Sequence, residues 1–440
     1  MCFRDSRVLG VVTLAILCSA WSLFAAEGKR SEEGGGMILD ASGVKGGLVI
    51  HVGCGDGRVT AGLLANDRYL VQGLDRDPRQ LKAARNHLRS LGLHGDVSVR
   101  HWDSSRLPYG DNIANLIVIT SDASITSGEI PRVLAPSGIV LTRRVLETKS
   151  LNLVSQSLEG LPEWNKYRKP VPDRIDQWTH YLHDAGNNAV AEDQGVGPPR
   201  HLQWKSNPTW CRSHEFASSV QSLVSSNGRL IGVIDEGIIG QPRGVPTFWT
   251  LIARDAFNGK LLWRRPCSRI NPHALVAMDD KVYVTLESKG PLSILDAATG
   301  ETMHACEETG KVHEIAICDD RVLLCTQLGG DNPGLHIAAA SPENGQLLWK
   351  KSTGSVGANT LVAGEGRVCY RDRDQLVCLK LESGEEIWRR DVKQDKRGYA
   401  VLYEGAVFLT GGSTRAFSLK SGELLWSGPD GNPHARNPPG

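Results

Sequence analysis

The sequence predicts a doubly wound α/β domain followed by an all-β propeller of about five blades, and three observations lead to this prediction. Short apolar runs alternate with helix-like stretches over residues 46–143. Residues 146–200 are then punctuated by prolines. From residue 201 onwards, a phrase that ends in Gly-x-x-x-Trp returns at intervals of about 40 residues, which is the period of propeller blades. A chain of 440 residues is long enough for two or three hydrophobic cores.

The first half contains five strand-like runs, at residues 48–51, 69–74, 97–101, 116–120 and 138–142. Between them lie helix-like stretches, of which residues 77–91 are the longest and carry Leu81, Ala84 and Leu88 on one face. Alternating strands and helices at this spacing favour a parallel sheet covered by helices on both faces. Ligands of such sheets bind beyond the carboxyl ends of the strands.

A glycine-rich loop follows the first strand at that edge, with Gly53, Gly55 and Gly57 at alternate positions. A dinucleotide-binding loop needs the spacing GxGxxG, so that a pyrophosphate can approach the following helix. Here Arg58 stands where the third glycine of that motif belongs. The loop therefore indicates a nucleotide-type cofactor other than a dinucleotide.

The loop resembles motif I of the class I S-adenosylmethionine-dependent methyltransferases, and three further segments continue the resemblance in order. These are "GLDRDP" at residues 73–78, "HWDS" at residues 101–104 and "EIPRVLAPSG" at residues 129–138. The resemblance implies a Rossmann-like methyltransferase fold over residues 38–145, with S-adenosylmethionine as cofactor. It implies the following cofactor-binding residues: His51, Gly53, Cys54, Gly55, Gly57, Asp75, Arg76, Asp103 and Ser104. It identifies no catalytic residue.

The chain departs from the methyltransferase pattern at three places. His51 stands where the family usually has an acidic residue, and Asn115 stands where an aspartate commonly opens the fourth strand. After the fifth strand, we expect little room for the usual two closing strands. We therefore expect a domain that binds the cofactor and has low or no activity.

Residues 146–200 are predicted to be a proline-rich linker, and they contain one group of candidate metal ligands. His180, His183 and Asp184 lie within five residues of one another, and imidazole and carboxylate groups at such spacing bind transition metals. The alternative is that these side chains cap turns and pack the linker onto the next domain. We favour this alternative and predict no metal.

The second half, residues 201–440, contains five related phrases whose glycines are residues 259, 300, 345, 384 and 422. Four of the five phrases end in tryptophan, and the second ends in His304 instead. The pattern resembles the tryptophan-docking repeat of pyrroloquinoline quinone (PQQ)-dependent dehydrogenases and of outer-membrane assembly propeller lipoproteins. The dehydrogenases also share an adjacent cysteine pair, which this sequence lacks. PQQ is therefore an unlikely cofactor.

The ends of the repeat region predict an open ring. Residues 202–205, "LQWK", predict an isolated fourth strand before the first blade, and residues 432–435, "NPHA", repeat the start of the second blade. We expect either a partner or a missing segment of a truncated reading frame to complete the ring. Histidines near the first strands, His214, His273, His313 and His434, either line the channel or form a ring for a metal or an anion.

The amino terminus predicts export. Residues 1–26 have the layout of a signal peptide, and residues 8–24 would act as a membrane anchor if they were not cleaved. We therefore expect a periplasmic or extracellular protein. The ten cysteines form no CxxC pair; Cys318 with Cys325 and Cys369 with Cys378 either bridge neighbouring strands or are buried thiols.

Three functions remain open at this point. The first is a S-adenosylmethionine-binding methyltransferase-like domain joined to a propeller that binds other molecules. The second is a scaffold without enzymatic activity, whose propeller binds proteins or envelope polymers. The third, and weakest, is a quinone-linked dehydrogenase. A net charge of +1 gives no basic surface for nucleic acid, so we expect no nucleic-acid partner.

Overall fold

The computed structural model describes residues 34–121, 125–126, 128–195, 197–198, 202–206, 219–237, 247–329, 334–392, 398–411 and 413–428. The chain divides into two compact units. The first comprises residues up to 172 together with 199–206 and 257–262, and the second comprises the rest. The predicted signal peptide, residues 1–26, lies outside the described residues. Among the described helices, none is both long enough and apolar enough to cross a bilayer.

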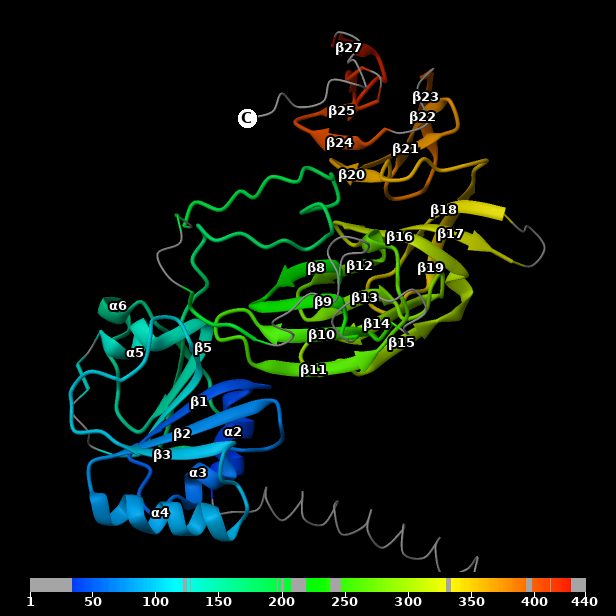
Figure 1. Ribbon diagram of the computed structural model, residues 1–440. Coiled ribbons are helices and arrows are strands. Elements are labelled where there is room, and N and C mark those ends of the chain that lie inside the picture. Colours follow the sequence, from blue (N-terminus) through cyan, green and yellow to red (C-terminus); the bar gives the residue numbers. More distant parts are fainter. Residues whose placement is uncertain are drawn as a thin grey trace, which may run out of the picture. The chain divides into compact units, whose positions relative to one another are not determined.

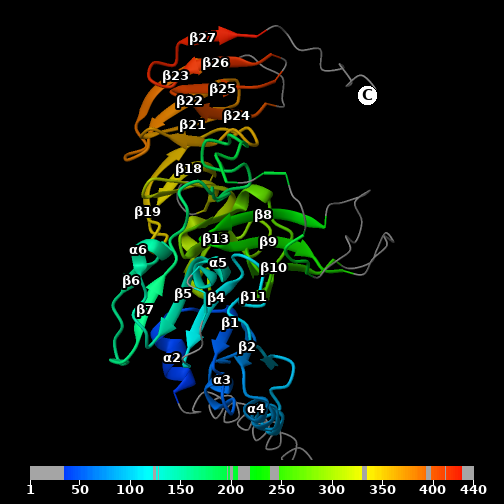
Figure 2. The same ribbon diagram turned by 90° about the vertical axis from the view of Figure 1, so that its left-hand side faces the viewer.

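The first unit is built on one seven-stranded sheet with the strand order β3-β2-β1-β4-β5-β7-β6 (Figures 1 and 2). Its first five strands run parallel and are β1 (Gly47–Val52), β2 (Tyr69–Asp75), β3 (Val97–His101), β4 (Ala114–Ile119) and β5 (Leu134–Thr142). The chain moves outward from β1 to β3 and then returns to place β4 on the other side of β1. This reversal puts the ends of β1 and β4 at the point where a doubly wound sheet binds its ligand.

Two closing strands follow β5, although the sequence predicts a linker there. β7 (Asn165–Arg168) pairs antiparallel with β5, and β6 (Val154–Gln156) pairs antiparallel with β7. The expectation of little room for closing strands was therefore wrong. Both strands are short and mostly polar, and Tyr167 is the one side chain in them that is buried in the core. No apolar alternation marks such strands in the sequence.

Helices cover both faces of the sheet. They are α2 (Gly35–Ser42), α3 (Arg58–Gly62), α4 (Pro78–Ser90), α5 (Glu129–Val133) and α6 (Thr148–Leu151). The longest, α4, begins where the Asp77 side chain accepts a hydrogen bond from the Arg79 amide, and it buries its apolar face as predicted. Successive residues of β1 contribute to two separate cores, because Val49 and Ile50 point to opposite faces of the sheet.

Among the described residues, the second unit shows five four-stranded antiparallel sheets, each formed by four consecutive strands. This confirms the prediction of about five blades. The first sheet contains β8 (Val220–Ser226), β9 (Arg229–Asp235), β10 (Trp249–Asp255) and β11 (Leu261–Pro266); the second contains β12 (Leu275–Met278), β13 (Lys281–Thr285), β14 (Leu292–Asp296) and β15 (Thr302–Cys306). The 3₁₀ turns η1 (Pro272–Ala274) and η2 (Glu307–Thr309) flank the second sheet.

The other three sheets repeat the same plan. The third contains β16 (Lys311–Cys318), β17 (Arg321–Leu328), β18 (Gly334–Ala340) and β19 (Leu347–Ser352). The fourth contains β20 (Val362–Gly364), β21 (Arg367–Asp372), β22 (Gln375–Lys380) and β23 (Glu386–Asp391). The fifth contains β24 (Ala400–Tyr403), β25 (Ala406–Leu409), β26 (Arg415–Ser418) and β27 (Leu424–Ser427), and Figure 2 shows it beside the fourth.

The repeated tryptophan of one blade docks on the repeated glycine of the next. The Trp388 indole N–H donates a hydrogen bond of 2.9 Å to the Leu419 carbonyl, and its ring covers Gly422 of the fifth blade. Gly422 has a φ of 71°, and a Cβ there would lie 2.6 Å from the Trp388 ring. Trp263 and Trp349 dock in the same way on the second and fourth blades. The turn glycine is therefore needed for space as well as for its backbone conformation.

The joint between the second and third blades lacks this tryptophan. His304 occupies the corresponding position of β15, opposite Ile294. Instead, Cys306 lies against Gly345, and its thiol is 3.5 Å from the Asn344 carbonyl oxygen. A thiol therefore replaces an indole at this joint.

The predicted isolated strand at residues 202–205 does not form. Residues 202–206 have no strand conformation, although the Trp204 ring packs against Gly259 as the docking tryptophans pack against theirs. The docking contact therefore forms without the strand. Residues 432–435, together with His214 and His434, lie outside the described residues.

Candidate functional site

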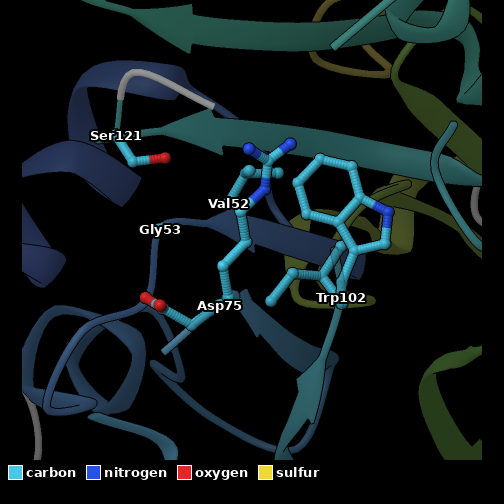
Figure 3. Close-up of a pocket in the computed structure, with 7 residues that line it drawn as sticks. Val52, Gly53, Asp75, Trp102 and Ser121 are labelled. Carbon is cyan, nitrogen blue, oxygen red and sulfur yellow. The ribbon is translucent and has the colours of Figure 1, made fainter. Parts of the chain in front are cut away.

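A hollow of about 240 Å³ opens at the carboxyl ends of the first strands, where the sequence predicts the cofactor. Seven residues line it: Val52, Gly53, Leu74, Asp75, Arg76, Trp102 and Ser121. Figure 3 shows Asp75, Trp102 and Ser121 around this space, each carried by a different segment of the chain. These segments follow or end β2, β3 and β4, so the strand order gathers residues that are far apart in sequence.

The glycine loop borders the hollow through Gly53. Gly53, Gly55 and Gly57 have φ angles of 84°, 53° and 87°, which residues with a side chain rarely adopt. A side chain at Gly53 would collide with Ser121 after β4, whereas a Cβ at Gly55 would meet nothing within 4 Å. The first glycine is therefore needed for packing, and the second leaves open space beside the backbone, where a ligand can approach.

Asp75 joins the end of β2 to the glycine loop. Its Oδ2 accepts a hydrogen bond of 2.8 Å from the Gly55 amide, and its Oδ1 accepts one of 3.0 Å from the Asp77 amide. Each carboxylate oxygen can accept a further hydrogen bond. Asp75 is thus held in place by the backbone while its remaining acceptor positions stay available to hydroxyl groups in the hollow.

Arg76 and Trp102 form the opposite wall. The Arg76 guanidinium carbon lies 5.4 Å from the centroid of the Trp102 ring, which is within the range of a cation–π contact. The Trp102 indole N–H donates to the Arg106 carbonyl at 2.8 Å, which fixes the ring. Arg76 also reaches the Ser104 carbonyl at 3.3 Å. The wall offers a flat aromatic surface beside a movable cation.

Asp103 and Ser104 do not line the hollow. Both side chains are exposed, and the backbone carbonyl of Ser104 is the group that contacts Arg76. The structure therefore brings Asp75 and Arg76 to the hollow and leaves Asp103 and Ser104 outside its lining. Trp102, the neighbour of Asp103, is the lining residue in this segment that the sequence did not single out; an aromatic residue directly after a strand was the available signal.

His51 lies behind the glycine loop and is 1% exposed. Its Nδ1 is 2.8 Å from the Thr60 hydroxyl, and its Nε2 is 2.9 Å from the Thr120 hydroxyl. The Thr120 hydroxyl donates to the Gly53 carbonyl at 2.7 Å, so Nε2 must carry the proton that His51 donates to Thr120. Burial lowers the pKa of His51 to about 4, and the ring is neutral. His51 thus supports the loop from behind and does not line the hollow.

Cys54 also turns away from the hollow. It is 3% exposed and packs against Gly73 of β2. Burial, with the nearby Asp75 charge, raises the pKa of the Cys54 thiol to about 12. A thiol with this pKa is protonated at neutral pH and is a poor nucleophile.

Glu129 and Arg132, from the segment that resembles a methyltransferase motif, form a nearly buried ion pair. Arg132 donates to both Glu129 carboxylate oxygens, at 2.7 and 2.6 Å, and also to the carbonyls of Leu107 and Tyr109. The hydrogen bond from Arg132 holds the pKa of Glu129 below its usual value. This pair anchors the segment after Trp102, so it supports the wall of the hollow and does not line it.

Asn115 also has a structural role. Its Oδ1 accepts a hydrogen bond of 2.8 Å from the Leu48 amide and so ties the start of β4 to β1. An amide oxygen makes this bond without placing a charge between the strands.

A second hollow, of about 190 Å³, opens at the ends of β4 and β5. Its lining is mainly aliphatic, with four polar residues among the ten: Ile119, Ile125, Ile130, Thr142, Arg144, Val145, Leu146, Glu147, Ser150 and Leu151. Since β4 lies next to β1 in the sheet, both hollows open at the same edge of the first unit. No sequence motif predicts this second hollow.

The candidate metal ligands belong to the second unit, and their ring nitrogens are engaged by other groups of the protein. His180 Nε2 accepts a hydrogen bond of 2.9 Å from the Ile317 amide, so this nitrogen is occupied by backbone. His183 lies between two carboxylates, with Nε2 at 2.7 Å from Asp176 and Nδ1 at 3.1 Å from Asp184. Among the described residues, no group of three or more histidine, cysteine or acidic side chains is placed to hold a metal ion.

The propeller histidines that are described do not form a ring. His273 is 8% exposed and lies 3.5 Å from Glu314 and beside the Tyr181 ring. Burial lowers the pKa of His273 to about 4. His313, the neighbour of Glu314, is half-buried and is not part of this contact.

The structure distinguishes between the two proposed cysteine pairs. Cys369 and Cys378 are directly opposite each other on β21 and β22, and both are fully buried free thiols. Cys318 pairs with Arg321 and Cys325 with Glu314 and Ile337, so these two cysteines are not opposite each other. Of the two proposed pairs, only Cys369 and Cys378 have the register that a cross-strand disulfide requires.

Comparison with known proteins gives two family matches in separate parts of the chain. Residues 49–138 match the methyltransferase domain family. Residues 333–438 match the family described as outer membrane protein assembly factor BamB. The methyltransferase GfsG from Streptomyces halstedii is 34% identical over 169 residues, which are 37% of this chain. The chain spans 59% of the length of that relative.

Two solved structures are similar to different parts of the chain. A SAM-dependent methyltransferase from Aquifex aeolicus is 15% identical, with a TM-score of 0.27, and the match covers 32% of this chain and 91% of the other. BamB from Moraxella catarrhalis is 13% identical, with a TM-score of 0.32, and the match covers 48% of this chain and 70% of the other.

The methyltransferase match implies a cofactor of the S-adenosylmethionine type, and the match contains the glycine loop, Asp75 and Trp102. The match to BamB spans the fourth and fifth sheets and contains the repeated tryptophans Trp349, Trp388 and Trp426. The chain therefore carries a methyltransferase-like domain followed by an all-β region of the BamB and PQQ-propeller type.

Proposed function

We propose that the first unit binds S-adenosylmethionine in the hollow between Gly53, Asp75 and Trp102. The observation that carries the proposal is the meeting of three different groups in one space. These are the Gly53 backbone at the start of the glycine loop, a fixed carboxylate at Asp75 and a fixed aromatic face at Trp102. The loop backbone leaves room for a nucleoside cofactor to approach, the carboxylate suits its hydroxyl groups, and the aromatic face suits its base.

Each wall of the hollow has its own task in this proposal. Asp75 accepts hydrogen bonds from the ribose hydroxyls, and it is already oriented by the Gly55 and Asp77 amides. Trp102 supports the adenine ring, and Arg76 moves off the Trp102 face to admit it. His51 and Thr120 hold the loop at the required shape. When bound, S-adenosylmethionine supplies a methyl group on a positively charged sulfur.

We assign the second hollow to the methyl acceptor. It lies at the same edge of the sheet, and its aliphatic lining fits a small, mostly apolar molecule. Transfer of a methyl group depends mainly on positioning two reactants and excluding water. An aliphatic pocket performs both tasks without a dedicated acid or base.

Calorimetric titration of the full chain with S-adenosylmethionine and with S-adenosylhomocysteine tests the cofactor proposal. We expect binding that weakens by about 10- to 100-fold in Asp75→Asn, because a hydrogen bond to a charged group contributes about 1.5–3 kcal/mol. Asp96→Asn is the matched control, since Asp96 is exposed and lies outside the hollow. A folded protein that releases no heat with either ligand would contradict the proposal.

We also propose that the propeller region binds a protein partner through its fifth blade. Leu424, Leu425 and Trp426 of β27 are 55%, 60% and 52% exposed, whereas the equivalent Trp388 of the fourth blade is 7% exposed because a blade covers it. An exposed indole at this position can pack on a glycine turn and donate to a carbonyl, as Trp388 does, so it fits a β-blade of another protein.

A photo-crosslinking residue at position 425 of the full chain tests this second proposal in an extract of the cell envelope. Cross-links should map to a β-strand segment of one other protein and should disappear in Trp426→Ala. Cross-links that reach only envelope polymer, or only this same chain, would contradict it. Export of the chain, which this partner requires, is part of the proposal; its test is the mass of the mature protein recovered from the envelope.

A further inference from the structure

One short segment of the second unit runs past all five blades. Five backbone amides, one from the first strand of each sheet, donate to consecutive parts of residues 178–186. The donors and acceptors are Ser225 to the Trp178 carbonyl (2.7 Å), Ala277 to the Thr179 carbonyl (3.0 Å), Ile317 to His180 Nε2 (2.9 Å), Ala363 to the Ala185 carbonyl (2.8 Å) and Leu402 to the Gly186 carbonyl (2.8 Å). We call residues 173–195 the strap.

The strap meets each sheet at an edge. β8, β12, β16, β20 and β24 are each the outermost strand in the order of their sheets, so each has amides that no strand partner accepts. A buried amide without an acceptor costs about 1–3 kcal/mol. The strap supplies one acceptor to every blade, and in doing so it fixes the order of the five edges along a single piece of chain.

Two side chains extend the contact. The His180 ring is 5% exposed, and burial lowers its pKa to about 3, so Nε2 remains an acceptor for Ile317. Its Nδ1 therefore carries the proton and donates to the Thr179 hydroxyl at 2.7 Å. The Asn187 side-chain amide nitrogen, Nδ2, donates to the carbonyls of Leu361 and Ala400, at 3.2 and 3.4 Å, and so connects the fourth and fifth blades.

The two ends of the strap are tied together at its base. The Gln194 amide donates to the Arg174 carbonyl at 2.8 Å, and the Glu192 amide donates to Asp176 Oδ2 at 2.7 Å. Asp176 also accepts from His183 Nε2 at 2.7 Å. Burial alone would lower the pKa of His183, but its hydrogen bonds to Asp176 and Asp184 hold the pKa above the usual value. Hydrogen bonds between its two ends thus close the strap into a loop.

We propose that the first strands of the five blades, which we call their inner edges, together form a binding groove for one extended peptide. The strap is the segment of this same chain that occupies the groove. The groove recognises the strap through a backbone carbonyl at four of the blades, through His180 Nε2 at the third blade, and through the Asn187 side chain. In this arrangement the blades depend on the strap, as well as on the joints between neighbours, to stay in register. The boundary of the folded blade region is then near residue 173 instead of residue 201.

Hydrogen exchange of the full chain tests the coupling between blades. In His180→Ala the Ile317 amide loses its acceptor, and in Asn187→Ala the fourth and fifth blades lose their shared donor. We expect exchange about tenfold faster in β16 for the first variant and in both β20 and β24 for the second, as the loss of one buried hydrogen bond predicts. Val190→Ala is the matched control, because Val190 is 63% exposed. Unchanged exchange in these strands would overturn the proposal.

Peptide exchange tests the groove directly and does not depend on how the variants fold. Recognition sites for a specific protease are inserted in the full chain after Asp173 and after Gly195, both of which are exposed. After cleavage, the strap should stay with the blades during gel filtration. A labelled peptide of residues 173–195 should replace it, and the same peptide with both alanine changes should compete at least tenfold less well. Loss of the strap on cleavage, with the blades still protected from exchange, would overturn the proposal.

Discussion

The first unit gathers polar side chains at one edge of a single sheet, whereas the second unit spreads them along a strap that meets five sheets. In the first unit, parallel strands that are distant in sequence end at the same edge, so their polar ends surround a hollow. In the second unit, each sheet forms from strands that are consecutive in sequence. An amide of the first strand of each sheet donates a hydrogen bond to the strap. The same residue types therefore surround an open hollow in one unit and form an internal joint in the other.

Two buried histidines make this comparison specific. His51 and His180 are both neutral, with pKa values lowered by burial to about 4 and about 3. His51 connects two hydroxyls beneath the glycine loop, and His180 connects the strap to the third blade. Each residue resembles a functional ligand in sequence, and each has both ring nitrogens engaged by the protein itself. A buried histidine is thus informative about a site only once its partners are known.

The largest effect is expected at a joint between blades. Trp388→Ala removes a nearly buried indole and its hydrogen bond to Leu419, and should lower the free energy of unfolding of the last two blades by about 3–5 kcal/mol. Urea unfolding followed by hydrogen exchange of β23 and β26 measures it. An effect confined to below about 1 kcal/mol would mean that the strap alone holds these blades together.

A pH-dependent effect is expected next, in the first unit. The pKa of His51 is 6.5 in an unfolded chain and about 4 in the fold. The unfolded state therefore binds more protons below pH 6.5, and stability falls as the pH falls. From pH 7 to pH 5, His51 should contribute a loss of about 2 kcal/mol.

Hydrogen exchange of the β1 amides at both pH values, corrected for intrinsic rates, measures this loss. His51→Gln should reduce the dependence on pH, and His94→Gln, at an exposed position, should leave it unchanged. Equal pH dependence in the wild type and in His51→Gln would show that His51 is not the group responsible.

A loss of similar size is expected where the hollow is supported from outside its lining. Arg132→Ala leaves Glu129 without its charged partner and frees the Leu107 and Tyr109 carbonyls. We expect a loss of about 2–3 kcal/mol in the first unit, from hydrogen bonds to charged groups. The binding of S-adenosylmethionine should weaken along with stability, because the Trp102 wall depends on this segment. Unchanged binding of S-adenosylmethionine in a destabilised Arg132→Ala protein would show that the position of Trp102 does not depend on the ion pair of Glu129 and Arg132.

The smallest effect is expected at the exposed end of the repeat. Trp426→Ala should change the free energy of unfolding by less than about 0.5 kcal/mol, as surface substitutions do. The same urea series as for Trp388→Ala measures it, so the two variants differ only in whether a blade covers the indole. A loss as large as that of Trp388→Ala would mean that Trp426 is covered in solution.

The elements that the sequence predicts well are those with a repeated pattern. The period of the docking tryptophans predicts the five four-stranded sheets, and the glycine loop with Asp75 predicts one side of the hollow. The strap could not be predicted, because its bonds are mostly backbone carbonyls that reach residues some 50 to 200 positions away, and backbone groups leave no mark in a sequence. β6 and β7 were missed because they are short and polar, and the role of His51 depends on Thr60 and Thr120.

The strap also has a consequence for how this repeat region can evolve. Repeat proteins commonly grow by duplication of one unit in the gene. Here each blade uses its own acceptor on the strap, with three on residues 178–180 and two on residues 185–186. An inserted blade would bring an inner-edge amide for which the strap has no acceptor. The number of blades and the length of the strap should therefore change together, and descendants with more blades should carry longer insertions between residues 180 and 187.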